Sequence, residues 1–134
     1  MLIDVDAFTE VNSEGGVAMG DLLLTCLAGV ILTNIRVMDM AGRYQGGQFI
    51  IFLPETDQPG AVILTHRIQK QLGTIASAVA GFELTFSASL IAVPEDGSEL
   101  EVVLPRLEQA LAQAKSEEQR GLVYLWGKGV ATGA

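Results

Sequence analysis

The residues with the clearest chemical meaning form a short glycine-containing segment, Arg43-Tyr44-Gln45-Gly46-Gly47-Gln48-Phe49. An apolar helical run precedes it, and a mostly apolar run over 50–54 follows it. A glycine pair between two short apolar strands is typical of a β-hairpin. Glycine at such a tip lets the backbone approach a ligand closely. The pair is therefore interpreted either as an ordinary turn or as the tip of a ligand-binding hairpin.

Two carboxylates, Asp4 and Asp6, stand at the end of the first apolar strand. Mg²⁺ prefers oxygen ligands and is commonly held by one or two protein carboxylates together with phosphates and water. The strand end is therefore a candidate metal site. The alternative is that both residues are solvated acids where the strand terminates.

A third group pairs basic with acidic side chains. Arg36 and Asp39 precede the hairpin, and Arg67 lies in the helix predicted after it. Arginine forks bind phosphate, and a carboxylate accepts hydrogen bonds from N–H groups. The alternative is that Arg36 and Asp39 form a simple surface ion pair, which contributes little to stability.

The elements that must position these residues alternate between strands and helices, which favours an α/β fold of the α+β sandwich kind. The patterns predict strands over 1–5, 41–44, 49–53, 82–92 and 122–126. They predict helices over 21–35 and 59–72, and a last helix that contains Pro105, in its first turn or at a kink, and ends near residue 115. Period-two alternation over 82–92 predicts one strand face against a helix layer. Residues 1–126 form one domain, and 127–134 are expected to be a tail.

Composition narrows the classes of function. A formal charge of -8 on 134 residues argues against a nucleic acid partner, which normally binds a basic face. The longest apolar stretch, 22–32, is too short to span a bilayer, and no signal sequence with a basic flank is visible, so a cytoplasmic domain without membrane insertion is expected. A single cysteine, Cys26, is expected to pack in the core.

Several motifs fall in one order and at one spacing, and together they resemble the GGDEF domain of the diguanylate cyclase family. The motifs are Leu2-Ile3-Asp4-Val5-Asp6-Ala7-Phe8, Asn12, Gly16, Gly20-Asp21, Arg36-Val37-Met38-Asp39, Arg43-Tyr44, Phe49, Pro54 and Lys115. The resemblance implies a nucleotidyl-cyclase-like, ferredoxin-like palm with a mixed, mainly antiparallel five-stranded sheet flanked by helices. Members usually carry a helix before the first strand, whereas this sequence opens at the strand. If this sequence is an excised fragment, the resemblance suggests a sensor or receiver domain upstream. If it is the natural start, the edge of the sheet is less covered and dimerisation is more strongly expected.

The signature motif departs from the family at both acidic positions, where Gly47 and Gln48 stand. The family joins two GTP molecules with divalent metal held by two carboxylates, of which the resemblance places the first at Asp4 and the second at Gly47. Losing one precisely placed stabilising group costs on the order of 100 to 1000-fold in rate. The expectation is a domain with no catalytic residues, a vestigial metal ligand at Asp4, no required cofactor, and Mg²⁺ only with residual GTP binding.

The nucleotide contacts implied by the resemblance are only partly retained. They are Asn12 and Asp21 for the guanine base, Gly46 at the hairpin tip and Lys115 for the triphosphate. The alternatives are a loop residue for Asn12, a helix N-cap for Asp21, and for Lys115 a charge that complements the helix dipole.

The regulatory site of the family is retained in full, because Arg36, Asp39 and Arg67 all match its product-binding residues. The resemblance therefore implies a catalytically degenerate domain that binds cyclic di-GMP and passes a signal to an attached or partner domain. The alternative function is a GTP-binding or dimerising cyclase homologue with weak or no synthesis of cyclic di-GMP. The expected partners are cyclic di-GMP, GTP in the second case, and a second copy of the chain.

Overall fold

The computed structural model describes the backbone of residues 1–6, 8–80 and 84–131, and the side chains of these residues other than 9–12, 14–15 and 79–80. The elements, in chain order, are β1 (Leu2–Val5), α1 (Phe8–Asn34), β2 (Met40–Arg43), β3 (Gln48–Phe52), α2 (Gln58–Ala80), β4 (Phe86–Leu90), α3 (Leu100–Ser116), β5 (Val123–Leu125) and β6 (Gly129–Val130).

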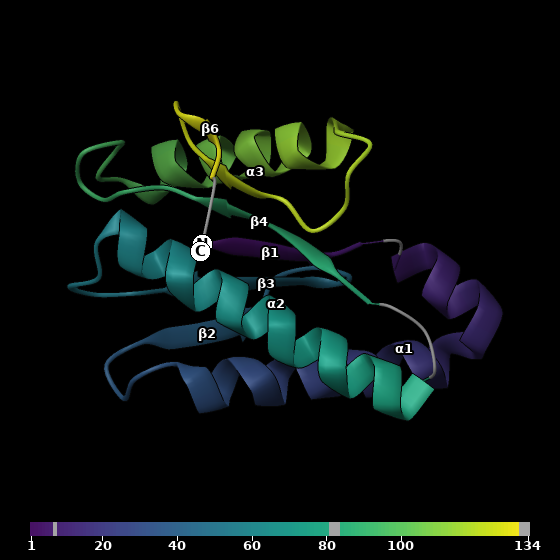
Figure 1. The fold of residues 1–134 in the computed structure, drawn as a ribbon. Coiled ribbons are helices and arrows are strands. Elements are labelled where there is room, and N and C mark those ends of the chain that lie inside the picture. Colours follow the sequence, from purple (N-terminus) through teal and green to yellow (C-terminus); the bar gives the residue numbers. More distant parts are fainter. Residues whose placement is uncertain (7, 81–83, 132–134) are drawn as a thin grey trace.

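The strands form one mixed sheet in the order β2-β3-β1-β4-β5-β6. The neighbouring pairs are antiparallel except for β4 and β5, which run parallel and are connected through α3. Figure 1 shows α3 on one side of the sheet and α1 with α2 on the other. The α/β sandwich with a mainly antiparallel sheet is confirmed, with six described strands where the sequence predicts five.

The alternation of β1 decides which side chains face which helix layer. Ile3 and Val5 enter the larger core with α1 and α2, while Leu2 packs against Leu107 and Leu111 of α3. Successive strand residues point to opposite faces. Asp4 and Asp6 therefore lie on the same face as Leu2, which is the face covered by α3.

Several predicted boundaries differ from the structure. Helix α1 begins at Phe8 instead of Asp21, and it is kinked at Gly16, whose φ of 80° and ψ of 171° are not helical. Helix α2 continues to Ala80, two turns beyond the predicted end. The N-cap role predicted for Asp21 is wrong, since this residue lies in the interior of α1.

The predicted strand over 82–92 is shorter, because β4 covers Phe86–Leu90; residues 82 and 83 lie outside the described part of the chain. All five residues of β4 are buried, so helices cover both of its faces instead of one. Part of the predicted tail forms β6, which pairs with β5. Pro105 lies inside α3, beyond its first turn.

Candidate functional site

The end of β1 brings a glutamine of the hairpin next to an aspartate. Residue Asp4 pairs in register with Gln48 of β3, and Gln48 Nε2 donates to Asp4 Oδ2 at 3.0 Å. Gln48 Oε1 is buried and has no hydrogen-bond partner among the described residues. The neutral amide therefore takes a place beside the carboxylate without adding negative charge.

Asp6 is the most completely bonded carboxylate of the site. Its oxygens accept hydrogen bonds from Thr85 Oγ1 at 2.7 Å and Ser87 Oγ at 2.7 Å, and from the backbone N–H of Gly121 at 3.0 Å. Burial alone would raise the pKa of Asp6, but hydrogen bonds from Lys115, Thr85 and Ser87 and the charge of Lys115 lower it. Asp6 is thus held as an anion that connects β1, β4 and the start of β5.

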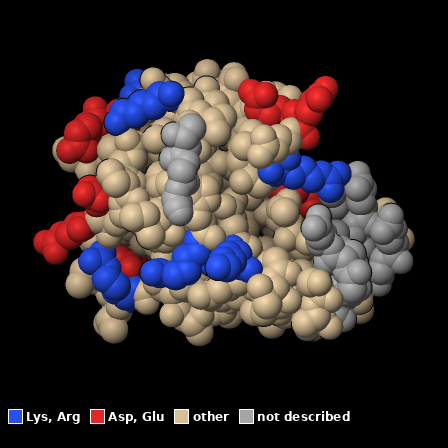
Figure 2. Space-filling view, in the orientation of Figure 1, with Lys and Arg blue, Asp and Glu red and all other residues tan. Residues whose placement is uncertain are grey.

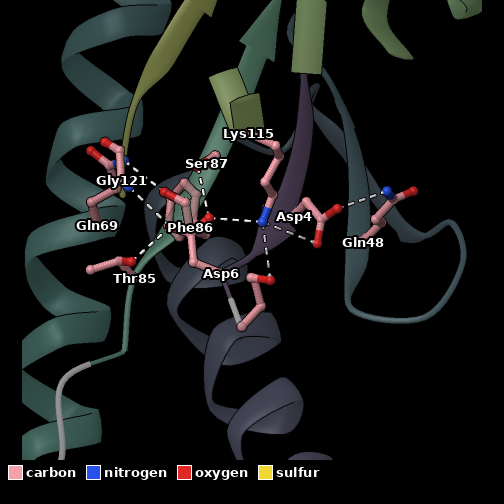
Figure 3. Close-up of polar contacts among 10 residues, drawn as sticks. Asp4, Asp6, Gln48, Gln69, Thr85, Phe86, Ser87, Lys115 and Gly121 are labelled. Atoms are coloured by element: carbon pink, nitrogen blue, oxygen red, sulfur yellow. Dashed lines mark hydrogen bonds and ion pairs between the residues drawn. The ribbon is translucent and has the colours of Figure 1, made fainter. Parts of the chain in front are cut away.

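The cation of this site belongs to the chain itself. Lys115, in the last turn of α3, places Nζ 2.7 Å from Asp6 Oδ1 and 3.6 Å from Asp4 Oδ1. Its Nζ also donates to the backbone oxygen of Val5 at 3.3 Å. Figure 3 shows the lysine reaching from α3 to lie between the two carboxylates. Both acids face α3, so strand alternation makes this contact possible.

The arrangement does not fit a Mg²⁺ ion. Asp6 is buried within its hydrogen bonds, and Asp4 is shared between Lys115 and Gln48. The described residues contain no group of three or more His, Cys, Asp or Glu side chains that could hold a metal. What remains is one partly exposed carboxylate and one neutral amide oxygen, which is a poor donor set for an ion that prefers carboxylates and phosphates.

The hairpin tip is closed by its own contacts. Gly46 has a positive φ of 49°, and its carbonyl accepts a hydrogen bond from Arg43 Nη2 at 2.7 Å. A Cβ atom at Gly47 would lie 3.0 Å from Cγ of Phe8. The ring of Phe8 therefore occupies the space that a side chain at residue 47 would need.

The two residues predicted to contact the guanine base both lie in α1. Asp21 is exposed there, and Asn12 is in the helix instead of a loop, with a side chain that lies outside the described residues. An open cavity of about 240 Å³ beside Lys115 is lined by Asp6, Ser87, residues 114 and 115, and residues 117–120. Its three acids, Asp6, Glu117 and Glu118, outnumber its two cations, so the lining does not favour a phosphate.

Arg36 and Asp39 form a close pair at the connection between α1 and β2. Arg36 Nη2 lies 3.1 Å from Asp39 Oδ1, and the backbone N–H of Arg36 donates to Asp39 Oδ2 at 2.7 Å. The Asp39 side chain is 3% exposed and that of Arg36 is 46% exposed. Burial would raise the pKa of Asp39, but its hydrogen bonds with Arg36 lower it. The same hydrogen bond with Asp39 raises the pKa of Arg36.

Arg36 also reaches the connection between β3 and α2. Its Nη2 donates to the backbone oxygen of Pro54 at 2.5 Å and to Thr56 Oγ1 at 2.7 Å. The sequence gives no sign of these two partners, because only the fold brings them next to Arg36. The guanidinium thereby lies between two loops, with close to half of its side chain open to solvent.

Arg67 is positioned on α2 by the last residue of α1. Its Nε donates to Asn34 Oδ1 at 2.8 Å, and Asn34 Nδ2 donates to Gln71 Oε1 at 2.8 Å. Asn34 precedes Arg36 by two residues, so the predicted set of Arg36, Asp39 and Arg67 lies on adjoining segments. Figure 2 shows basic side chains gathered on the lower part of the face, where α1 and α2 lie in Figure 1.

Comparisons with known proteins agree with this architecture. The family model of the diguanylate cyclase GGDEF domain matches residues 1–121. The chain is 28% identical over 127 residues to the response regulator PleD of Caulobacter vibrioides, covering 92% of this chain and 28% of PleD. It is 31% identical over 128 residues to the diguanylate cyclase DosC of Escherichia coli K12, covering 94% of this chain and 28% of DosC. The chain therefore spans less than a third of these relatives.

Solved structures share the fold. The active GGEEF domain of a diguanylate cyclase from Vibrio cholerae superposes with a TM-score of 0.85 at 24% identity, covering 96% of this chain and 81% of that one. The coiled coil and GGDEF domain of DgcB from Caulobacter crescentus, solved in complex with c-di-GMP, has a TM-score of 0.68 at 22% identity, covering 92% and 66% of the chains. Since the family model matches nearly the whole sequence, this chain belongs to the GGDEF family of diguanylate cyclases.

Proposed function

We propose that this GGDEF domain binds cyclic di-GMP at Arg36, Asp39 and Arg67 and does not synthesise it. The observation that carries the proposal is the state of the carboxylates at the end of β1. Asp6 is paired with Lys115, which Asp4 shares at 3.6 Å, while the position that the family uses for a second metal ligand is Gly47. Phosphoryl transfer between two nucleotides relies on metal ions to neutralise developing charge, so the reaction lacks its main support here.

The ligand-binding half of the proposal is supported by the chemistry of the second cluster. Cyclic di-GMP offers two phosphates and two guanine bases, which suit arginine forks and a carboxylate acceptor. Arg36 is 46% exposed at its side chain, and only Nε of Arg67 is committed to Asn34 in the contact described above. The domain would then act as a cytoplasmic receptor module that transmits its state to an attached or partner domain.

The alternative, a GTP-binding homologue, is favoured by the presence of Lys115 and Asp4 at one edge of the sheet. Against it, the Lys115 ammonium is already shared by two carboxylates and the carbonyl of Val5. A triphosphate would have to compete with these partners for the lysine. Under this alternative Mg²⁺ would accompany the nucleotide and not the free protein.

Isothermal titration separates the two functions. We expect micromolar or tighter binding of cyclic di-GMP by the wild-type chain, loss of binding in Arg36→Ala, and no change in Lys128→Ala. The control removes an equal charge from a lysine whose side chain donates to Gln58. Unchanged affinity in Arg36→Ala would contradict the proposed site. Binding of GTP with Mg²⁺ but not cyclic di-GMP would favour the alternative.

Mass spectrometry tests the catalytic half independently. After incubation of the wild-type chain with GTP and Mg²⁺, we expect no cyclic di-GMP above the level of a protein-free sample. Sustained product formation would refute the view that the domain is catalytically degenerate, whatever the titration shows.

A further inference from the structure

The outer face of α1 is apolar where a surface helix normally carries charge. Asp21 is the one charged residue between Gly16 and Asn34. By length and composition this stretch could cross a membrane, but 33% of it is buried within the fold. A helix that is apolar all round is ordinarily covered on all sides. Leu23 and Leu27 point into the core, so the opposite face has no cover from the described part of the chain.

The exposed residues of this face follow the spacing of a helix pair. Ala18, Leu22, Thr25, Gly29 and Leu32 are all exposed and are separated alternately by four and three positions. This is the interval at which one helix packs along another in a coiled coil. We name these five residues the α1 seam.

In the α1 seam, Leu22 and Leu32 flank a small centre, and Ala18 lies beyond Leu22. Leu22 is 43% exposed and Leu32 is 63% exposed, whereas a Cβ atom at Gly29 would meet nothing within 4 Å. A partner helix can therefore approach the backbone closely at the centre while leucines pack on either side of it. Large apolar side chains exposed in such an array, and not scattered singly, mark an interaction surface.

We propose that the α1 seam binds the α1 seam of a second copy of the chain, with the two helices antiparallel. A two-fold interface requires one patch that is complementary to itself. With the axis between Thr25 and Gly29, Leu22 of one copy packs against Leu32 of the other. Each Thr25 then lies opposite the glycine of its partner, so the small centre and its flanking leucines match.

Charge supports the antiparallel direction. Asp21 lies toward the start of the seam. A parallel pair would place Asp21 beside Asp21, which is repulsive, whereas the antiparallel pair puts the two aspartates at opposite ends of the interface. Antiparallel helix dipoles also attract each other.

A lipid bilayer fits the same face less well. The chain has a formal charge of -8, so an anionic membrane surface would repel it. Insertion of the 16–34 stretch would also carry the charged Asp21 toward hydrocarbon, which is unfavourable. The seam covers only about 20 Å of helix, and a contact of this length is near the small end of specific interfaces, so the dimer is expected to be transient.

Sedimentation equilibrium from micromolar to millimolar chain, without nucleotide, tests the interface. We expect a concentration-dependent dimer for the wild type and a monomer for the Leu22→Glu/Leu32→Glu variant. Ile63→Glu is the matched control, because Ile63 is 59% exposed on α2 and outside the seam. A wild type that stays monomeric, or a double variant that still dimerises, would overturn the proposal.

Disulfide trapping tests the direction of the pair. In a Cys26→Ser background, a chain with Thr25→Cys is mixed with a chain carrying Gly29→Cys and oxidised. The antiparallel arrangement predicts that the mixed disulfide exceeds either like-with-like disulfide, as mass spectrometry would show. Excess of like-with-like products, or no trapping, would refute it. Co-sedimentation with phosphatidylcholine vesicles that is lost in Leu22→Glu/Leu32→Glu would assign the face to lipid instead.

Discussion

The ammonium of Lys115 donates to the buried carboxylate of Asp6 at 2.7 Å, across 109 positions of the chain. The contact ties the last turn of α3 to the end of β1 and supplies the positive charge that the carboxylates at this edge require. A buried acid without a cation would be costly, whereas an acid with three further hydrogen bonds and a lysine is stable.

Replacing Lys115 by methionine should destabilise the fold strongly. The substitution keeps the length of the side chain but leaves Asp6, which is 5% exposed, without a counter-ion. Breaking one side of such a pair costs about 3 kcal/mol in free energy of unfolding, to be measured by urea denaturation at pH 7. Lys70→Met, at an exposed lysine of α2, is the control. Equal stability of the two variants would show that Lys115 contributes no more to the free energy of unfolding than an exposed lysine does.

The buried amino terminus predicts a pH dependence for a chain that starts with a free Met1. Its amine donates to the carbonyl of Ile51 at 2.9 Å, and burial lowers its pKa from 8.0 to about 5. Between these values the unfolded chain binds the proton and the folded chain does not. The free energy of unfolding should therefore fall as the pH is lowered from 8 to 5, by roughly 4 kcal/mol.

The matched sample for this prediction is the same chain acetylated at Met1, which has no amine to titrate. Urea denaturation across the same pH range should show the loss in the free chain and a much flatter profile in the acetylated chain. If both profiles have the same slope, another group is responsible for the pH dependence.

Replacing Gly47 by alanine should destabilise the fold, because the added methyl group would crowd the ring of Phe8. The new Cβ would lie 3.0 Å from Cγ of Phe8, whereas at Gly42 a Cβ would meet nothing within 4 Å. Overpacking of this kind costs about 1 to 3 kcal/mol. Gly47→Ala should thus unfold at lower urea than the wild type, and Gly42→Ala should not. Matching midpoints would mean that Phe8 moves aside freely.

Asn34→Ala should weaken the cyclic di-GMP affinity proposed above without disturbing the fold. Asn34 Oδ1 accepts from Arg67 Nε at 2.8 Å, so its loss frees the guanidinium to adopt other rotamers. Ordering one such freed side chain on binding costs about 0.5 to 1.5 kcal/mol, which converts to an affinity loss of about two- to tenfold by titration. Thr74→Ala, on the same helix, is a control that removes a hydroxyl bonded only to its own backbone turn at Lys70. An unchanged affinity in Asn34→Ala would separate Arg67 from ligand binding.

Local patterns in the sequence were sufficient for the sheet and the hairpin. Strand β1, the pair β2 and β3 around Gly46 and Gly47, and the end of α3 near Lys115 lie within a few residues of their predicted positions. Period-two and helical apolar patterns are properties of neighbouring residues, so they are readable without the fold. The replacement of both signature acids by Gly47 and Gln48 is likewise visible from the sequence alone.

The tertiary structure decided what those residues contact. The length of α1 is one example, since helical structure extends back to Phe8 although the non-helical backbone of Gly16 kinks the helix. The capture of Lys115 by Asp6 is another, because strand alternation and the position of α3 above the sheet jointly bring them together. Such contacts join segments far apart in the chain, and local periodicity carries no information about them. The sequence thus determined which groups are present, and the fold determined which of them neutralise one another.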